Sequence, residues 1–260
     1  MIAITSIELS GWVASLMWPF MRIGAMLMAA PVFGARLVPV RVRLALAMIL
    51  AWILSPMVYS DAVVINPLSV EGLMVSAQQV LIGLAMGFTL QMVFSAIVIA
   101  AQSMAMGMGL GFATAVDPQN GVQVPVVAQY YLTLATLIFL ALNGHLLIIQ
   151  ILVDSFQSLP VGLDGLSREG LWALVSWGSR MFAGAVMIAL TAMTSLLVIN
   201  LAFGVMSRAA PQLNIFGVGF PVMMGAGFIV IMLSLPGLAP QVSELMQDAF
   251  ELIGLLVAGG

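Results

Sequence analysis

One run of the sequence limits the possible folds more than any other feature: Gly72–Val116 covers 45 residues without a formally charged side chain. A membrane-spanning helix needs about 20 consecutive apolar residues, so this run predicts one long helix and a further element. Of the whole chain, 63% is hydrophobic and 7% is charged, against about 25% charged residues in a soluble domain. A soluble core cannot hide that much apolar surface, so lipid or a large protein partner must cover it.

Charged residues divide the chain into about six apolar segments. Their approximate ranges are 11–32, 44–59, one within 72–116, 124–153, 171–201 and one within 213–235. The tail predicts a short amphipathic helix, with Leu245, Phe250 and Leu252 opposite Glu244, Asp248 and Glu251. Twelve prolines and 25 glycines interrupt the apolar runs, for example at Pro19, Pro31, Pro39 and Pro56. Non-helical backbone within a bilayer needs protein or water around it, so we expect a single all-α domain, residues 1–260, whose helices pack on other helices.

The charge balance excludes several classes of function. All seven basic residues are arginine and the net charge is −3, so nucleic acid, which requires a cationic surface, is not an expected partner. The chain has no cysteine and one histidine, which excludes disulfides, thiolate chemistry and a His-rich metal site. Neither an HExxH motif nor a lysine-containing phosphate-binding loop is present. We therefore expect no enzymatic activity and no cofactor.

The arginines also predict an orientation in the membrane. Arg36, Arg41 and Arg43 lie between the first and second apolar segments, and Arg208 lies between the fifth and sixth. Only Arg168 lies in a loop that would be on the other side of the membrane from these two loops. Because cytoplasmic loops are enriched in basic residues, both termini are predicted on the periplasmic side. The N-terminus lacks the basic region of a secretory signal, so the first segment is expected to be retained.

A polar, non-helical stretch, RAAPQLNIFGVGFP, runs from Arg208 to Pro221 between two apolar regions. Its prolines push the preceding residues toward extended geometry, and Gln212 and Asn214 can bond freed backbone groups or cap a helix. One interpretation is an ordinary inner loop followed by a helix kinked at proline. The other is a rigid half-turn buried in an assembly and anchored by apolar side chains, namely Leu213, Ile215, Phe216 and Phe220.

A second stretch, SMAMGMGLGFATAVDPQNG, alternates glycine with methionine or leucine between Ser103 and Gly121. Each glycine lowers helix stability by about 1 kcal/mol, and methionine fills irregular apolar gaps, so the pattern predicts a soft segment. Residues 117–121 give a turn signal. The alternative is that Gly107 and Gly111 form a close helix contact, as Gly83 and Gly87 can.

Two charged side chains lie well inside the apolar segments. Arg22 and Arg180 are candidates for function because ionisable groups are rare at such depth. We favour pairing with an acid on a neighbouring subunit, as an assembly lock, over contact with a substrate. Asn143-Gly144-His145 is read either as part of a proton path or, more often for a lone histidine, as a satisfied core or interface residue. Asn200 is expected to make an interhelical hydrogen bond.

Three stretches resemble one known family. They are PQLNIFGVGFP with Arg208 upstream, APVFGARLVPVRVRLALAM from Ala30 to Met48, and MGMGLGFATAVDPQNG from Met106 to Gly121. Together they resemble the FliR/SctT family of type III secretion export-gate proteins, and the resemblance extends over essentially the whole chain. The full string at residues 211–221 favours the flagellar branch over the injectisome branch.

The resemblance implies a subunit built of kinked helical hairpins in a ring with FliP-like and FliQ-like subunits. Residues 1–200, approximately, would be FliP-like and residues 201–260 FliQ-like. The other expected partners are FlhB-like and FlhA-like export components, membrane lipid and unfolded flagellar export substrates. The expected location is the bacterial inner membrane at the flagellar basal body, with a projection toward the periplasm.

The resemblance also implies two sets of functional residues. A plug that closes the pore would contain Met106, Gly107, Met108, Gly109, Leu110, Gly111, Phe112 and Asp117. Its apolar side chains would block and dewet the lumen until a substrate displaces them. An assembly motif would contain Arg208, Pro211, Gln212, Leu213, Asn214, Phe216, Gly219, Phe220 and Pro221.

Two other classes of function compete with an export gate. Six apolar segments with broken helices also suit a secondary transporter for small molecules, but that class predicts internal repeats, and the sequence has no convincing repeat. An intramembrane enzyme needs a nucleophile with a partner base, and no serine has a recognisable partner beyond His145.

Overall fold

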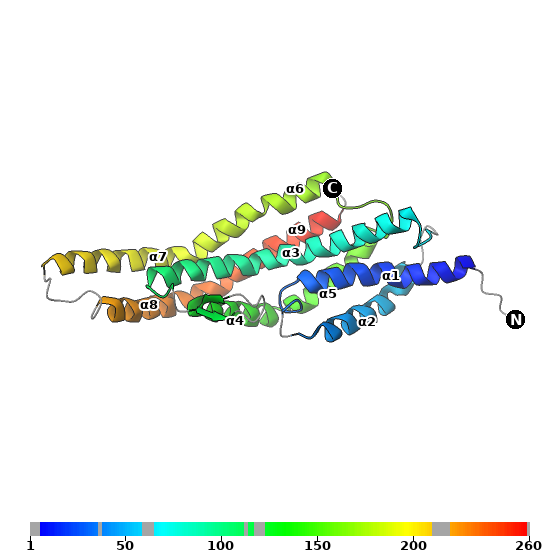
Figure 1. Cartoon of the computed structure of the whole chain (residues 1–260). Coiled ribbons are helices and arrows are strands. Elements are labelled where there is room, and N and C mark those ends of the chain that lie inside the picture. Colours follow the sequence, from blue (N-terminus) through cyan, green and yellow to red (C-terminus); the bar gives the residue numbers. More distant parts are fainter. Residues whose placement is uncertain are drawn as a thin grey trace. The chain divides into compact units, whose positions relative to one another are not determined.

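The computed structural model describes residues 6–35, 38–58, 65–111, 114–116, 123–209 and 219–258 (Figure 1). Within these ranges the regular secondary structure is helical apart from one small hairpin, which confirms the predicted all-α class. The elements in chain order are α1 (Ser6–Ala29), α2 (Val40–Val58), α3 (Val70–Gly107), β1 (Thr114–Val116), β2 (Gln123–Pro125), α4 (Val126–Ala141), α5 (Gly144–Ser158), α6 (Arg168–Ser176), α7 (Gly178–Ala209), α8 (Phe220–Ser234), η2 (Leu235–Gly237) and α9 (Leu238–Val257).

Every predicted apolar segment contains at least one helix among its described residues. Among the described residues, four stretches are long and apolar enough to cross a membrane: 11–29, 70–107, 168–209 and 220–257. A fifth is added if α4 and α5, which meet at an angle of 62°, count as one span. The 38 residues of α3 make a helix about 57 Å long, nearly twice the hydrocarbon thickness of about 30 Å. Helices α3 and α7 are thus longer than a bilayer requires.

Some of the predicted breaks are real and others are not. Pro19 lies inside α1 and Pro56 inside α2, so neither proline ends its helix. The break between α4 and α5 is at Asn143, whose φ of 56° is left-handed. The single apolar segment predicted at 124–153 is therefore two helices, and the dipeptide Asn143-Gly144 is the turn signal that marks the break.

The chain forms two compact units. The first contains residues 1–92, 143–177 and 247–260, and the second contains 93–142 and 178–246. The boundaries between the units fall inside α3 and α9, so each of these helices has one part in the first unit and one part in the second. The boundary proposed near residue 200 falls within α7 and stays a prediction.

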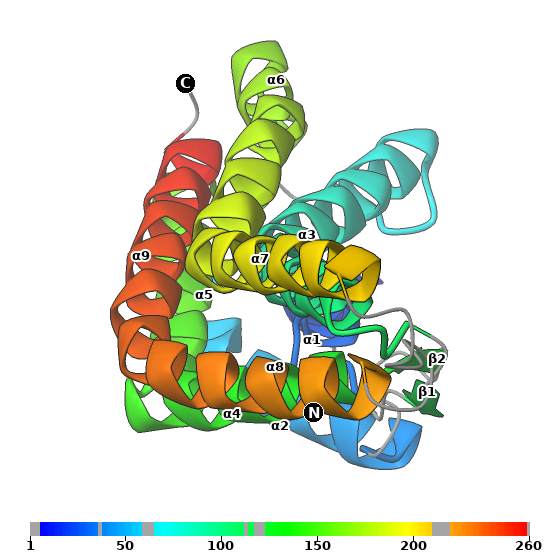
Figure 2. The same ribbon diagram turned by 90° about the vertical axis from the view of Figure 1, so that its left-hand side faces the viewer.

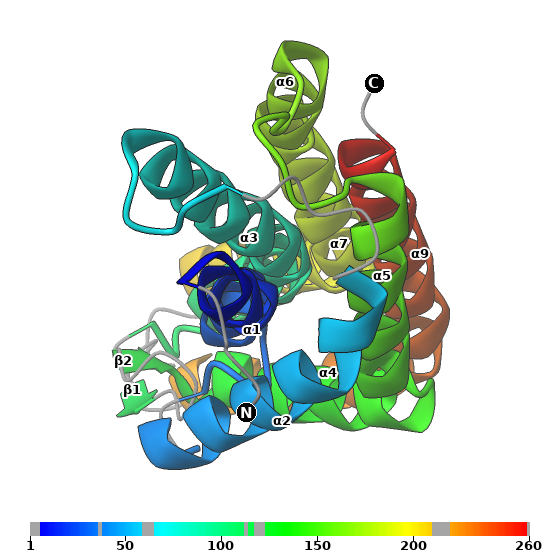
Figure 3. The same cartoon turned by 90° about the vertical axis from the view of Figure 1, so that its right-hand side faces the viewer.

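In the first unit, α1 and α2 pack against each other, and Figure 1 shows them running in opposite directions; Figure 3 looks along α1, with α2 beside it. Helix α1 also lies directly against α3, because Gly83 and Gly87 have no side chain to hold the backbones apart. A Cβ atom at Gly87 would lie 2.7 Å from Cβ of Ala29 and 2.8 Å from the carbonyl oxygen of Met26. The predicted close contact through this glycine pair is confirmed.

In the second unit, α7 and α8 pack as an antiparallel pair (Figure 2). Strands β1 and β2 pair antiparallel, with Thr114 opposite Pro125; this short hairpin was not expected from the sequence. The predicted turn at residues 117–121 lies outside the described residues. Phe94 of α3 meets Phe139 of α4 edge to face, with ring centroids 5.9 Å apart.

The helices differ in how much of their surface the chain itself covers. In the most apolar window of α3, 67% is buried, against 28% for α6–α7 and 22% for α8–α9. The predicted amphipathic tail lies within α9, where Leu245 and Leu252 are buried and Glu244 and Glu251 are exposed. The apolar surface of α7 and α8 therefore needs cover from lipid or from another protein.

Candidate functional site

The C-terminal end of α3 is closed by a glycine cap. Gly109 has a φ of +77°, and its backbone N–H donates to the carbonyl oxygen of Met106 at 3.0 Å. The N–H of Leu110 reaches back to the carbonyl oxygen of Ala105 at 2.8 Å. These two hydrogen bonds form a Schellman motif, which requires a left-handed residue and so favours glycine. The cap sets the direction in which the chain leaves α3.

Two residues at this helix end pack on α8. Met108 is fully buried, and its side chain lies along Gly227: a Cβ atom at Gly227 would be 2.5 Å from its Cγ and 2.6 Å from its Cε. A Cβ atom at Gly109 would be 3.2 Å from Cε2 of Phe220. Gly227 is thus a notch that receives methionine, and the ring of Phe220 covers Gly109.

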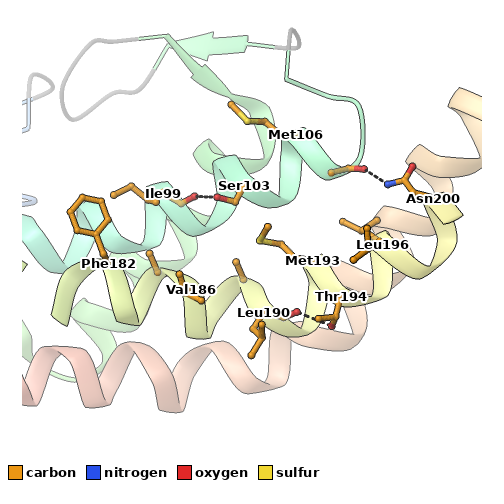
Figure 4. Close-up of a pocket in the computed structure, with 14 residues that line it drawn as sticks. Ile99, Ser103, Met106, Phe182, Val186, Leu190, Met193, Thr194, Leu196 and Asn200 are labelled. Carbon is orange, nitrogen blue, oxygen red and sulfur yellow. Dashed lines mark hydrogen bonds between the residues drawn. The ribbon is translucent and has the colours of Figure 1, made fainter. Parts of the chain in front are cut away.

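Gly107, the last residue of α3, contacts α7. The side-chain amide of Asn200 donates to the carbonyl oxygen of Gly107 at 3.3 Å, and Leu196 packs on the same glycine (Figure 4). This carbonyl belongs to the last turn of α3 and has no partner within its own helix. The predicted interhelical hydrogen bond of Asn200 is confirmed.

A groove of about 660 Å³ lies between α3 and α7 next to this contact (Figure 4). Ile99, Ser103 and Met106 line it from α3; the residues of α7 include Phe182, Val186, Leu190 and Met193. The hydroxyl groups of Ser103 and Thr194 donate to carbonyl oxygens of their own helices. These two hydroxyl groups therefore have their hydrogen atoms engaged within the helices, and the groove presents mainly apolar side chains to a ligand.

A second organised cluster surrounds Arg22 in the first unit. The guanidinium is fully buried; its Nε donates to Oε1 of Gln79 at 2.7 Å. Its Nη1 donates to the carbonyl oxygen of Ser155 at 2.8 Å and to the Oγ of that residue at 3.1 Å. Its Nη2 donates to the carbonyl oxygen of Leu159 at 2.9 Å, and the ring of Phe156 lies 4.3 Å from the guanidinium carbon.

These contacts show how the chain itself accommodates the charge of Arg22. Its hydrogen-bond partners among the described residues are neutral groups of the same chain, and the expected pairing with an acid on a neighbouring subunit stays a prediction. Backbone carbonyl dipoles, an amide oxygen and an aromatic face together stabilise the buried cation. Arg22 links α1 to α3 and to the C-terminal end of α5.

Comparison with known proteins decides the family. Residues 13–249 match the family described as "Bacterial export proteins, family 1". The chain belongs to the bacterial export proteins of family 1. It is also similar to three proteins named "Flagellar biosynthetic protein FliR". The protein from Escherichia coli (strain K12) is 38% identical over 258 residues, covering 99% of this chain and 98% of the relative. The one from Pectobacterium carotovorum subsp. carotovorum is 38% identical over 253 residues, with coverages of 97% and 96%. The one from Bacillus subtilis (strain 168) is 30% identical over 219 residues, with 82% of each chain covered.

In this family-1 export protein the predicted plug residues fall into two environments. Met106 is 70% exposed and Met108 is fully buried, so the alternating pattern separates an outward methionine from an inward one. Gly107 is the last residue of α3, whereas Gly111 lies beyond the helix. The alternative of a helix contact through Gly107 and Gly111 is therefore wrong. Phe112 and Asp117 lie outside the described residues.

The predicted assembly motif of the export protein is described at its two ends. Arg208 is exposed in the last turn of α7, where a cation is favourable to the helix dipole. Gly219 precedes α8, and Phe220 and Pro221 begin it. Proline is suited to the start of a helix. Pro211, Gln212, Leu213, Asn214 and Phe216 lie outside the described residues.

Two other candidate residues, Arg180 and His145, lie within the described part of the chain. Arg180 is exposed on the first turn of α7 and so is not a buried charge within this chain. His145 is half-buried, and its Nδ1 has no hydrogen-bond partner among the described residues; both readings of His145 stay predictions.

Arg43 donates to the carbonyl oxygens of Ala35 and Val38, so it holds the turn between α1 and α2. Gly227 was not singled out from the sequence, because nothing there indicates that it faces Met108.

Proposed function

We propose that this chain is a subunit of the flagellar type III export gate. The observation that carries the proposal is 38% identity across almost the full length of both chains with the flagellar biosynthetic protein FliR of Escherichia coli. Membership of an export-protein family and four or five candidate spans support a role in transport rather than in catalysis. The large uncovered apolar surface of α7 and α8 supports function within an assembly.

The expected assembly contains FliP-like and FliQ-like subunits, with which this chain forms the pore. FlhB-like and FlhA-like components act beside it, and unfolded flagellar proteins pass through it. The assembly lies in the bacterial inner membrane at the flagellar basal body and extends toward the periplasm, with both termini of this chain periplasmic. We infer that residues 1–200 correspond to a FliP-like part and residues 201–260 to a FliQ-like part.

The plug segment, residues 106–112, closes the pore in this proposal. Apolar side chains such as the exposed Met106 exclude water and ions from a narrow lumen. An entering polypeptide displaces the segment and so opens the pore. Deletion of residues 106–112 is expected to make membranes permeable to small ions. Unchanged permeability of a fully assembled mutant complex would contradict the plug role.

The flagellar assignment is preferred to the injectisome and transporter alternatives because the similar proteins named above are all called flagellar. The test is complementation of a bacterium that lacks its own FliR. Restored motility, together with a discrete heteromeric mass when the chain is co-expressed with FliP-like and FliQ-like subunits, is the expected result. A monodisperse chain that ignores those subunits and restores no motility would overturn the proposal.

A further inference from the structure

We propose that α8 is a latch on the plug segment: Phe220 and Gly227 hold Gly109 and Met108, and export requires Met108 to leave Gly227. This inference rests on the proposed export function. It gives the end of the Pro211–Pro221 motif a role in gating in addition to assembly. It also joins two sequence features that lie more than 100 residues apart in the chain.

The two latch contacts lie on one face of α8. Phe220 and Gly227 are seven residues apart, which places them two turns apart on the same side of a helix. Met223 and Ile231 follow the same spacing and are buried, whereas Phe228 and Ile229 on another face are more than half exposed. A shift or rotation of α8 therefore acts on both contacts together.

The notch at Gly227 fits methionine only because it lacks a side chain. A Cβ atom there would overlap Cγ, Sδ and Cε of Met108, which would lie 2.5, 2.9 and 2.6 Å away. The thioether side chain is unbranched and flexible, so it can enter and leave a narrow notch. The contact is purely apolar, with no hydrogen bond or ion pair to rebuild each time it closes.

Helix α7 supplies the opposite side of the latch. Asn200 bonds the carbonyl oxygen of Gly107, so three consecutive residues, 107 to 109, are held by α7, by Gly227 and by Phe220 in turn. The motif region connects α7 to α8 in sequence. Anything that changes the packing of α8 on α7 therefore changes the hold on the plug segment.

A reversible cross-link tests whether the latch must open. The chain contains no cysteine, so the pair Met108→Cys and Gly227→Cys adds the only two thiols. A Cβ atom at Gly227 lies 2.5 Å from Cγ of Met108, so the two Cβ atoms are within about 4 Å, which is disulfide range. Oxidation of the assembled complex is expected to stop secretion of flagellar proteins, and a reductant is expected to restore it.

The matched control is Met108→Cys with Gly225→Cys. Gly225 is in the same helix, but nothing lies within 4 Å of a Cβ atom built there, so neither cross-linking nor loss of secretion is expected. Unchanged secretion from complexes whose 108–227 cross-link is complete would overturn the latch. Failure of the unaltered chain to restore secretion would instead overturn the export function on which it rests.

A second test needs no oxidation. Gly227→Ala fills the notch and expels Met108, so assembled complexes are expected to leak ions several-fold more than complexes carrying Gly225→Ala. Adding Met108→Ala removes the three clashing atoms, so the double variant is expected to leak less than the sum of the single variants. Yield and melting temperature of the complex are measured in parallel, since a purely structural role would change those and not the leak. Equal leakage from the Gly227→Ala and Gly225→Ala complexes would contradict the proposal.

Discussion

The two ends of α3 are held in opposite ways. Toward its N-terminal end, Gly83 and Gly87 let the backbone of α1 come into direct contact, and the buried Arg22 donates four hydrogen bonds to Gln79, Ser155 and Leu159. At its C-terminal end the contacts are one hydrogen bond of 3.3 Å from Asn200 and apolar packing, in which Leu196 lies on Gly107, Met108 on Gly227 and Phe220 on Gly109. One helix is thus held by a buried cation in the first unit and mainly by apolar packing in the second.

The difference follows from chemistry rather than from the number of contacts. A buried guanidinium that loses its partners leaves unsatisfied polar groups, so the Arg22 network opens only at a high cost in free energy. A methionine that leaves an apolar notch loses only packing, and lipid or another apolar side chain can replace it. The first arrangement therefore resists opening, whereas the second can open and close again at a lower cost in free energy.

The largest effect is expected for Arg22→Met. Methionine keeps most of the apolar stem but leaves the amide oxygen of Gln79 and the carbonyl oxygen of Leu159 without their donor. With about 1–3 kcal/mol for each unsatisfied buried group, the loss of stability should be about 3 kcal/mol or more. The check is the melting temperature of the detergent-extracted complex and the amount of chain in membranes.

Arg180→Met provides the comparison, since it makes the same chemical change at an exposed arginine. It should lower the melting temperature much less than Arg22→Met. Similar losses in both variants would mean that the Arg22 network does not fix the first unit.

A smaller effect is expected for Gly83→Ala. The added methyl group would collide with the backbone of α1 at Arg22 and Met26, and overpacking of this kind costs about 1–3 kcal/mol. The matched change is Gly24→Ala on α1, where nothing lies within 4 Å of the new methyl group. That variant should be neutral or more stable by up to about 1 kcal/mol, from helix propensity alone. Thermal unfolding curves that do not separate the two variants would refute the close contact.

The smallest effect is expected for Asn200→Ala. It removes one long hydrogen bond from an exposed residue, worth about 0.5 kcal/mol at the lower end of the usual range. Stability should hardly change, while hydrogen exchange at the amides of Met108 and Gly109 should become faster, because the helix end opens more often. Exchange that is unchanged there would show that Asn200 does not restrain the plug segment.

Much of the fold could be predicted because it depends on local patterns. The long uncharged run became α3, the Gly83–Gly87 spacing became a helix contact, and the polar Asn200 within an apolar helix found a partner on another helix. In each case the apolar surroundings explain the outcome, because backbone and side-chain polar groups there must find hydrogen-bond partners within the protein.

What could not be predicted depends on contacts distant in sequence. Arg22 stood out, but its partners are an amide, a hydroxyl and two carbonyl groups 57 to 137 residues away, and a sequence does not show which backbone carbonyl groups will act as acceptors. Gly227 is one of 25 glycines, and only the fold brings it to Met108. The break at Asn143 was accessible, since its Asn-Gly dipeptide is a turn signal that the apolar run around it obscured.

The bare apolar faces of α7 and α8 have a consequence for how a cell must handle this protein. A chain with so little of these helices covered cannot accumulate safely, because free copies would associate with one another or with unrelated membrane proteins. Binding of the correct neighbours stabilises the folded chain by mass action, and unbound copies remain exposed to proteases. Its level in the membrane should therefore follow the supply of its neighbours rather than its own rate of synthesis.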